Sequence, residues 1–365
     1  MPLSLLHSFL FDIFLALIIL IFAGLTFIAS HREKDDLVFS RYQGKALFIV
    51  PCRGRDFTLE ENLRAIIQSV GNRYGVVAVV DSEDDEAVPA IKSAGMKYIV
   101  ASPVCTRCSG KVRAVYSALV AFPGYAVYAI ADSDILPATS WAEDLLSPFS
   151  MEDTGISTTF PYFFPRGGFW SVVKLVWGFV GLGMMESSVT RFGWGGSLAF
   201  RSSLLDGSGK DFFLSYVSDD VALTKLCKSK GYKIRYVRSA APVINSPDDF
   251  STFMEWANRQ TALSIYSTPS VFRFGVIFYG STVLIEAASV VLSILVFPAF
   301  VLLLAPVLIT ALRNVQRAGR MPVAVFLISL FIPFLYLYNL IRARKMSEIR
   351  WRGRTYSLGN EDKPA

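Results

Sequence analysis

Cysteine and charged residues are both scarce in this chain of 365 residues, and each scarcity excludes a class of protein. Four cysteines are too few for the disulfide framework of a small secreted protein. Charged residues make up 18% of the chain and hydrophobic residues 53%, whereas an average soluble protein has about 25% charged residues. The uncharged residues are concentrated in long apolar runs, which excludes a soluble cytosolic protein.

Three apolar regions are long enough to form membrane helices, since about 20 apolar residues cross the hydrocarbon core. Residues 9–29 are interrupted by charge only at Asp12, and residues 321–341 contain no charge. Residues 271–312 contain one acid and one base, so they predict two spans or one span with an interfacial helix. No Lys or Arg precedes the first run and no clear cleavage site follows it, so we expect a retained anchor over residues 1–30.

The net charge is +6, and the excess of bases lies beside the C-terminal apolar runs, at residues 313–320 and 342–354. Basic residues beside a membrane span set its orientation and contact anionic lipids. We therefore expect the bilayer as a partner and no nucleic acid. Residues 271–341 are predicted to be membrane segments and residues 342–365 a basic cytosolic tail.

The segment between the apolar regions has ordinary globular composition, and we predict one catalytic-sized domain over residues 31–248. Continuous apolar runs typical of buried strands alternate there with segments of helical spacing. Strands are predicted at 45–51, 76–80, 97–101 and 126–131, and helices at 59–70, 86–94 and 111–120. This alternation predicts an α/β fold with a mostly parallel sheet covered on both faces.

Three expectations concern single helices. Thr58 and Glu61 have the spacing of a capping box at the start of the helix over 59–70. Residues 169–185 predict either a core helix or a helix on the membrane surface. Residues 249–270 mix aromatic and polar side chains, which predicts an amphipathic helix at the headgroup level.

Aspartates follow two of the predicted strands directly. Asp81 follows the strand at 76–80, and Asp132 and Asp134 form an Asp-x-Asp after the strand at 126–131. Ligands bind at the carboxyl ends of parallel strands, and two carboxylates on a short loop suit Mg²⁺ or Mn²⁺ bound through a substrate diphosphate. A simple turn, or a solvated acidic loop around Asp81, is the alternative.

Two charged motifs begin predicted helices. Asp219 and Asp220 could simply cap a helix and complement its dipole, or one of them could deprotonate an attacking hydroxyl. Lys111 could contact a phosphate or a neighbouring carboxylate. Cys105 and Cys108 form half of a zinc-ribbon pattern, but two loop thiols, with or without a local disulfide, are the simpler interpretation.

The order of these motifs resembles that of the membrane-bound inverting family 2 glycosyltransferases of the GT-A fold, in particular the ceramide glucosyltransferase-like group. The segment VPCRGRDFTLEENL, which contains Pro51, looks like the first nucleotide-binding strand and helix of that family. The tail segment IRWRGRTY, residues 349–356, is similar to the Trp-Arg-Gly-Arg tail of the ceramide-type members.

The resemblance implies roles for individual residues. Asp81 would contact the nucleotide, Asp132 and Asp134 would bind the metal, and Asp220 would be the general base. Asp219 stands where members of the family often have Glu. The remaining donor contacts are expected at Pro51, Asp84, Lys111 and Arg259, and the acceptor or diphosphate contacts at Trp256, Gln260, Arg350, Trp351, Arg352 and Arg354.

One motif departs from the family. Arg259 matches the Arg of its Gln/Arg-x-x-Arg-Trp motif, but Trp256 replaces Gln/Arg and Gln260 replaces the final Trp. Because that Trp often lines the acceptor site, the departure concerns the acceptor and weakens the interpretation as a processive polysaccharide synthase.

We therefore expect an inverting transferase that moves a hexose from a nucleotide sugar, UDP-linked, to a hydroxyl of a membrane lipid. The catalytic domain of this multi-pass protein should face the cytosol. A polyprenyl-phosphate sugar synthase and a non-catalytic membrane protein with a degenerate GT-A domain are the alternatives. A transporter is disfavoured because the spans are few and lack clustered charge.

Overall fold

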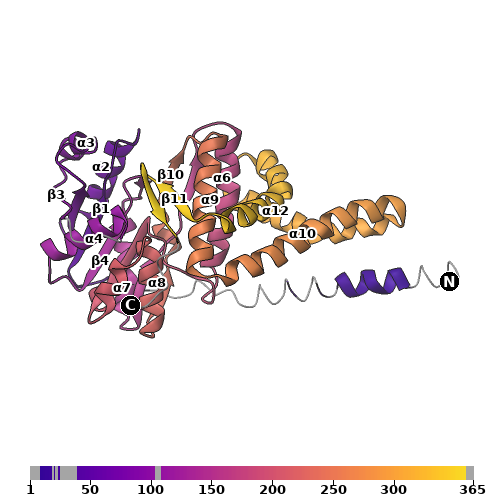
Figure 1. Cartoon of the computed structure of the whole chain (residues 1–365), viewed down its shortest axis with the longest axis horizontal. Coiled ribbons are helices and arrows are strands. Elements are labelled where there is room, and N and C mark those ends of the chain that lie inside the picture. The colour runs from indigo at the N-terminus through magenta and orange to yellow at the C-terminus, as the bar shows by residue number, and fades with distance from the viewer. Residues whose placement is uncertain (1–8, 19, 21–23, 25–38, 103–107, 359–365) are drawn as a thin grey trace. The chain divides into compact units, whose positions relative to one another are not determined.

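The computed structural model describes residues 9–18, 20, 24, 39–102 and 108–358 (Figure 1). The chain divides into two compact units. The sheet unit comprises Asp35–Ser171, Val180–Ser251 and Met346–Ala365, and the helical unit comprises Met1–Lys34, Val172–Phe179 and Thr252–Lys345.

A seven-stranded sheet with the order β3-β2-β1-β4-β8-β6-β9 forms the centre of the sheet unit. β1 (Ala46–Pro51) pairs in parallel with β2 (Gly75–Val80) and β4 (Val127–Ala131), and β2 pairs in parallel with β3 (Tyr98–Val100). The alternating α/β pattern predicted these four strands, and each end is confirmed within one residue.

The other half of the sheet has mixed direction. β8 (Ser197–Arg201) runs antiparallel between β4 and β6 (Thr154–Thr158), and β6 pairs in parallel with β9 (Lys233–Tyr236). A second sheet has the order β5-β10-β7, formed by Ile135–Leu136, Val243–Ser246 and Tyr162–Pro165. The predicted fold class, a mostly parallel sheet in an α/β domain, is confirmed.

Alternate residues of the strands face opposite layers. Ile49 and Val79 belong to a core cluster shared with α4 (Gly110–Ala121) and α8 (Asp219–Ser229), whereas Phe48 packs its ring 5.1 Å from that of Trp141 at the start of α5. Helices therefore cover both faces. The remaining elements of this unit are α2 (Leu59–Val70), α3 (Val88–Ala94), α5 (Trp141–Leu146), α7 (Gly209–Leu214) and the short helices Ser147–Ser150, Ser202–Leu205 and Arg238–Ala240.

The capping box predicted for α2 is wrong. Thr58 has φ −107° and ψ 11°, not the extended conformation that an N-cap needs, and its side chain makes no cap hydrogen bond. Instead, Asn62 Nδ2 donates to Thr58 Oγ1 at 3.2 Å and to the carbonyl of Ser133 at 3.0 Å. This fully buried Asn thus fastens α2 to the Asp-x-Asp loop.

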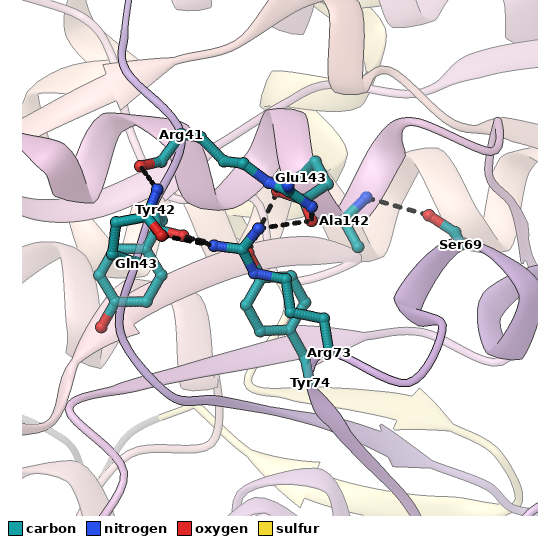
Figure 2. Close-up of polar contacts among 8 residues, drawn as sticks. All are labelled: Arg41, Tyr42, Gln43, Ser69, Arg73, Tyr74, Ala142 and Glu143. Atoms are coloured by element: carbon teal, nitrogen blue, oxygen red, sulfur yellow. Dashed lines mark hydrogen bonds and ion pairs between the residues drawn. The ribbon is translucent and has the colours of Figure 1, made fainter.

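Two arginines fasten the amino-terminal edge of the sheet (Figure 2). Arg41, before β1, makes two hydrogen bonds to the Glu143 carboxylate, at 3.0 and 2.7 Å, and Tyr74, before β2, donates to it at 3.2 Å. Arg73 lies 3.6 Å from Glu143 and donates to the carbonyl of Tyr42. The hydrogen bond from Arg41 lowers the pKa of Glu143. Because this cluster lies at the opposite strand ends from Asp81 and Asp132, we regard it as structural.

Within the described residues, three helical segments are long and apolar enough to cross a membrane. They are α10 (Ser270–Leu295), Pro298–Ala318 and α12 (Pro322–Arg344). The middle segment consists of a 3-10 helix, Pro298–Leu304, followed by α11 (Ala305–Ala318). Residues 271–312 therefore form two such segments, and α12 continues through Pro333. Of the anchor predicted over 1–30, Phe9–Ile18 is a shorter apolar helix and most of the rest lies outside the described residues.

Buried polar side chains join three helices of the helical unit. Trp177, on α6 (Phe169–Met185), donates to Asn339 Oδ1 at 3.1 Å, and Asn339 Nδ2 donates to Asn258 Oδ1, on α9 (Phe250–Ser267), at 2.9 Å. Tyr336 of α12 donates to the carbonyl of Trp177 at 2.7 Å. The stretch of α6 in this unit is buried, which favours the core alternative for residues 169–185.

Candidate active site

A pocket of about 100 Å³ lies where the carboxyl ends of β1, β2 and β4 meet. Its lining comes from the residues at those strand ends, from the first turns of α4 and from the C-terminal hairpin β11 (Glu348–Trp351) and β12 (Arg354–Ser357). It consists of Pro51, Cys52, Arg53, Val79, Asp81, Gly110, Lys111, Ala114, Asp132, Ser133, Asp134, Trp351, Arg352 and Tyr356.

Asp81 is surrounded by guanidinium groups. Arg113, on the first turn of α4, donates to Asp81 Oδ1, while Arg354 and Arg53 lie 3.1 and 3.5 Å from Oδ2. These arginines come from three separate parts of the chain. Three cations around one carboxylate leave a surplus of positive charge, which suits an incoming anionic group such as a diphosphate.

Lys111 connects two of the acidic motifs. Its ammonium lies 2.7 Å from Asp132 Oδ1 and 3.4 Å from Asp219 Oδ2, and it donates to the carbonyl of Gly195 at 3.0 Å. Its side chain is 8% exposed. Burial lowers the pKa of Lys111, but the charges of Asp132 and Asp219 outweigh this and raise it above the ordinary value. Lys111 is therefore a permanent cation between the Asp-x-Asp loop and α8.

Asp219 and Asp220 begin α8 but have different surroundings. Asp219 is buried; desolvation raises its pKa to about 7, although the Lys111 ammonium opposes the rise. Asp220 is half-buried and accepts hydrogen bonds from the Gly195 and Val221 amides, at 3.0 and 2.8 Å, and from the Ser218 hydroxyl. These donors fix the orientation of the Asp220 carboxylate.

Gly195 lies close to these charged groups. A Cβ at this position would be 3.0 Å from Lys111 Nζ, 3.1 Å from Asp219 Oδ2 and 3.2 Å from Asp220 Oδ2. A methyl group at this position would therefore require these charged groups to shift by a few tenths of an ångström, so the absence of a side chain lets the loop lie close to α8.

Asp132 and Asp134 fit a divalent metal by the chemistry of their oxygens. Both line the pocket at the end of β4. Among the described residues no group of three or more His, Cys, Asp or Glu side chains could hold a metal. Two carboxylates match an ion that takes its other ligands from water and substrate phosphates, as Mg²⁺ commonly does.

The C-terminal hairpin supplies the last part of the lining. Arg352 makes two hydrogen bonds to the Asp56 carboxylate, at 2.8 and 2.6 Å, and Trp351 places its ring 5.9 Å from Lys111 Nζ. Arg352 and Gly353 both have positive φ, 49° and 73°. Such backbone suits the type I′ turn of a tight hairpin, but it costs about 1–2 kcal/mol at a residue with a side chain.

The structure brings most of the predicted site residues together. Arg354 contacts Asp81, and Asp219 and Asp220 lie beside Lys111. The predicted residues that line the pocket are Pro51, Asp81, Lys111, Asp132, Asp134, Trp351 and Arg352. Asp84 lines a neighbouring groove, and Arg350 is exposed on β11. Trp256, Arg259 and Gln260 lie on α9 and do not line this pocket. Cys105 lies outside the described residues.

Among the residues that sequence reasoning missed are three charged side chains and one phenol at the site: Arg53, Asp56, Arg113 and Tyr356. Arg53 follows β1 as Asp81 follows β2, so the rule that strand ends converge could have found it. Arg113 is on the same turn of α4 as Lys111. No local pattern indicates Asp56 or Tyr356, since their partners lie at the other end of the chain.

The model of the family described as glycosyl transferase family 21 matches residues 15–363, nearly the whole chain. The chain belongs to this family. The expectation of a glycosyltransferase is thereby confirmed, and the family that matches is family 21. No curated protein matches the chain in sequence.

This family 21 chain is similar to solved structures of two glycosyltransferases. A mannosyltransferase from Pyrobaculum calidifontis in complex with GDP-Man and Mn²⁺ has a TM-score of 0.53 and 17% identity, covering 91% of this chain and 97% of that one. Glucosyl-3-phosphoglycerate synthase from Mycobacterium tuberculosis, with Mn²⁺ and UDP-glucose, has a TM-score of 0.43 and 16% identity. The match covers 62% of this chain and 79% of that one. At 17% identity, the similarity to the mannosyltransferase shows a shared GT-A fold and no more.

Proposed function

We propose that this family 21 glycosyltransferase transfers a hexosyl group from a nucleotide sugar, UDP-linked, to the hydroxyl of a membrane lipid, with inversion at the anomeric carbon. The observation that supports this best is the position of Lys111, between Asp132 at 2.7 Å and Asp219 at 3.4 Å. This position supports the proposal because Lys111 connects Asp132, a proposed metal ligand, with Asp219, the neighbour of the proposed base Asp220.

In the proposed reaction, the acceptor oxygen forms a bond to the anomeric carbon while the bond from that carbon to the diphosphate oxygen breaks. The proton of the acceptor hydroxyl goes to Asp220, and the nucleoside diphosphate leaves with the bonding electron pair. The Gly195 and Val221 amides hold Asp220 in one orientation, which is what a positioned general base requires. Lys111 and the arginines around Asp81 stabilise the negative charge of the leaving group.

Asp132 and Asp134 would hold Mg²⁺ or Mn²⁺, which would neutralise charge on the donor diphosphate. Asp81, with Arg53 and Arg113, forms the part of the pocket that would receive the nucleotide. Two similar structures contain Mn²⁺ with a nucleotide sugar, and this motivates the choice of metal.

The lipid acceptor is proposed from the helical unit. Three of its segments could cross a bilayer, and an enzyme held at the membrane surface meets a lipid hydroxyl without a search through solution. Trp256, Arg259 and Gln260 on α9 remain our candidates for acceptor contacts, and a cytosolic orientation of the sheet unit remains part of the proposal.

The test uses the full chain in lipid nanodiscs with Mn²⁺, a panel of UDP- and GDP-hexoses, and three acceptors: ceramide, a total membrane lipid extract and a polyprenyl phosphate. Products are identified by mass spectrometry and their anomeric configuration by NMR. Asp220→Asn should lower the transfer rate by about 10²–10⁴-fold. Asp211→Asn, an exposed acid on α7, is the matched control.

If the Asp220→Asn variant still forms glycolipid at the wild-type rate, Asp220 is not the general base. Full activity of that variant with the polyprenyl phosphate would favour the polyprenyl-phosphate synthase, because a phosphate acceptor needs no general base. Absence of Mn²⁺-dependent nucleotide binding would favour a non-catalytic protein.

A further inference from the structure

The chain enters and leaves the helical unit from the same compact unit. Beyond the N-terminal segment, the sheet unit includes the chain up to Ser251, apart from a short stretch of α6, and again from Met346. Arg352, after the helical segments, is bonded to Asp56, before them, at 2.8 and 2.6 Å. A folded unit of this kind lies on one side of a bilayer, because loops and sheet edges cannot leave their backbone groups in hydrocarbon. The chain over residues 252–345 therefore crosses the membrane an even number of times, and its three candidate segments cannot all cross.

α10 and the segment that follows it, Pro298–Ala318, run back along one another. The Ser289 hydroxyl, near the end of α10, donates to the carbonyl of Phe300 at 2.9 Å. Apolar side chains of both segments and of the N-terminal helix meet in one cluster, formed by Phe14, Phe300 and Leu303 with Ile18, Ile285 and Leu292 packed against them. α10 has 26 residues and is about 39 Å long. The return segment has 7 residues of 3-10 helix and 14 of α-helix, together about 35 Å, so it can bring the chain back to the side on which α10 begins.

α12 packs against the two ends of this pair. Asn314, near the end of α11, donates to Ser329 Oγ of α12 at 3.1 Å, and both side chains are buried. The rings of Tyr279, near the start of α10, and Tyr336 are 4.7 Å apart. If α10 and Pro298–Ala318 go out and back, the start of α10 and the end of α11 lie on the same side of the membrane. α12, which contacts both, then lies on that side too.

Basic residues gather at both ends of α12. They are Arg313, Arg317 and Arg320 before its start and Arg342, Arg344 and Lys345 at its end. A crossing α12 would hold the two groups on opposite sides of the membrane, whereas basic residues beside membrane spans gather on one side. If instead α10 and Pro298–Ala318 make both crossings, the two groups lie together on the side of the sheet unit.

The two faces of α12 differ in their surroundings. Its exposed side chains recur every three or four residues and are apolar or aromatic: Val323, Leu327, Phe331, Phe334, Tyr338 and Ile341. The opposite face is buried and carries the polar groups of Ser329 and Asn339. One apolar exposed face is typical of a helix that lies along a leaflet. α10, in contrast, exposes neighbouring positions such as Val290 and Val291, as expected of a helix that acyl chains surround.

We propose that α10 and Pro298–Ala318 enter and leave the bilayer on the side of the sheet unit, and that α12 does not cross. α12 lies in the leaflet on that side, with its exposed apolar face against acyl chains. The bases at both ends of α12 then reach the headgroups of the same leaflet. This inference goes beyond the proposed function, because it concerns the path of the chain through the membrane and no step of the reaction.

The first experiment labels added cysteines with a membrane-impermeant maleimide, in intact bacterial cells and in inside-out vesicles from the same cells. Each full-length variant carries one added cysteine at an exposed position: Ser208→Cys, Phe297→Cys, Gln316→Cys or Thr355→Cys. Ser208→Cys marks the side of the sheet unit, and the chain without an added cysteine gives the background of the native thiols. Gln316→Cys and Thr355→Cys should react in the same preparation as Ser208→Cys, and Phe297→Cys should lose its labelling there.

The labelling pattern has outcomes that contradict the proposal. Reaction of Gln316→Cys in the opposite preparation would mean that α12 crosses the membrane. Reaction of Phe297→Cys in the same preparation as Ser208→Cys would mean that α10 does not cross. Either result overturns the proposal.

A second experiment measures the depth of α12 in lipid nanodiscs. Nitroxides are attached one at a time at Leu327, Phe331, Phe334 and Tyr338, and their depth is taken from collisions with oxygen and with a nickel chelate. The four depths should be nearly equal. The matched control is the same label at Phe274, Phe278 and Leu284 of α10, whose depth should change by about 1.5 Å per residue. An equally steep change along α12 would refute its position in the leaflet.

Neither experiment uses a donor or an acceptor, so the inference and the proposed function fail separately. A chain that is labelled as expected but transfers no hexose would refute the proposed function and keep the path of the chain. Transfer of hexose by a chain whose Gln316→Cys reacts on the opposite side would do the reverse.

Discussion

Lys111, on the first turn of α4, faces the buried carboxylate of Asp219, on the first turn of α8, with 3.4 Å between Nζ and Oδ2. Two helix starts from distant parts of the sequence thus share one ion pair. Both side chains are nearly inaccessible to solvent, so neither charge can be hydrated if the other is removed.

We predict that Lys111→Met destabilises the chain by roughly 3–5 kcal/mol, because it leaves the buried carboxylate of Asp219 without a cation. Urea unfolding followed by circular dichroism measures this. Lys92→Met, on the exposed face of α3, is the control, since the ammonium of Lys92 lies over the ring of Tyr98 at 5.8 Å and is exposed. The double variant Lys111→Met with Asp219→Asn should recover part of the lost stability. An unchanged midpoint in Lys111→Met alone would contradict the importance of the pair.

The second prediction concerns pH. Burial raises the pKa of Asp219 from 3.8 to about 7, so the folded chain binds more protons than the unfolded chain between these values. The protonated Asp219 therefore contributes to stability below about pH 4, and this contribution is lost as the pH rises toward 7. Asp219→Asn should show a smaller loss of stability across this window. Thermal unfolding from pH 4 to 8 tests it; parallel curves for variant and wild type would count against the raised pKa.

The third prediction concerns Gly195. Gly195→Ala should lower activity and destabilise the fold by about 1–3 kcal/mol, because the added Cβ would displace the charged ends of Lys111, Asp219 and Asp220. Gly183→Ala is the matched control: its Cβ would have nothing within 4 Å, and it lies in α6, where Ala is favoured over Gly by about 0.5–1 kcal/mol. Equal behaviour of the two variants in activity and melting temperature would show that the space at Gly195 is not critical.

The fourth prediction concerns the metal. Asp134→Asn, or removal of divalent ions with a chelator, should weaken nucleotide diphosphate binding by about tenfold or more, since the diphosphate would lose a bridging cation. Isothermal titration calorimetry with UDP and GDP measures this, with Asp211→Asn as control. The effect of the chelator should disappear in Asp134→Asn. An equal effect of the chelator on variant and wild type would place the metal elsewhere.

Much of the fold could be predicted from local patterns. The apolar runs of β1, β2 and β4 and the helical spacing of α2 and α4 are properties of short segments, and they predicted these elements closely. The same holds for Asp81 and Asp132, which had to lie at one edge because parallel strands end together. The prediction of a capping box failed because a capping hydrogen bond depends on the backbone angles of Thr58, and these are not the angles of an N-cap. In the same turn, Asn62 makes a tertiary contact with the Asp-x-Asp loop, which no local pattern specifies.

The apolar segments, the mostly parallel sheet and the carboxylates at its edge could be predicted from local sequence, because they depend on hydrophobicity and periodicity within a few turns or strands. Which charges meet depends on the tertiary fold: Arg113 and Arg354 pair with Asp81, Arg352 pairs with Asp56, and Lys111 lies between Asp132 and Asp219. These pairs join residues far apart in the chain, and no local pattern specifies a partner. Their positions follow from how the strands are ordered and how the C-terminal hairpin returns to the sheet.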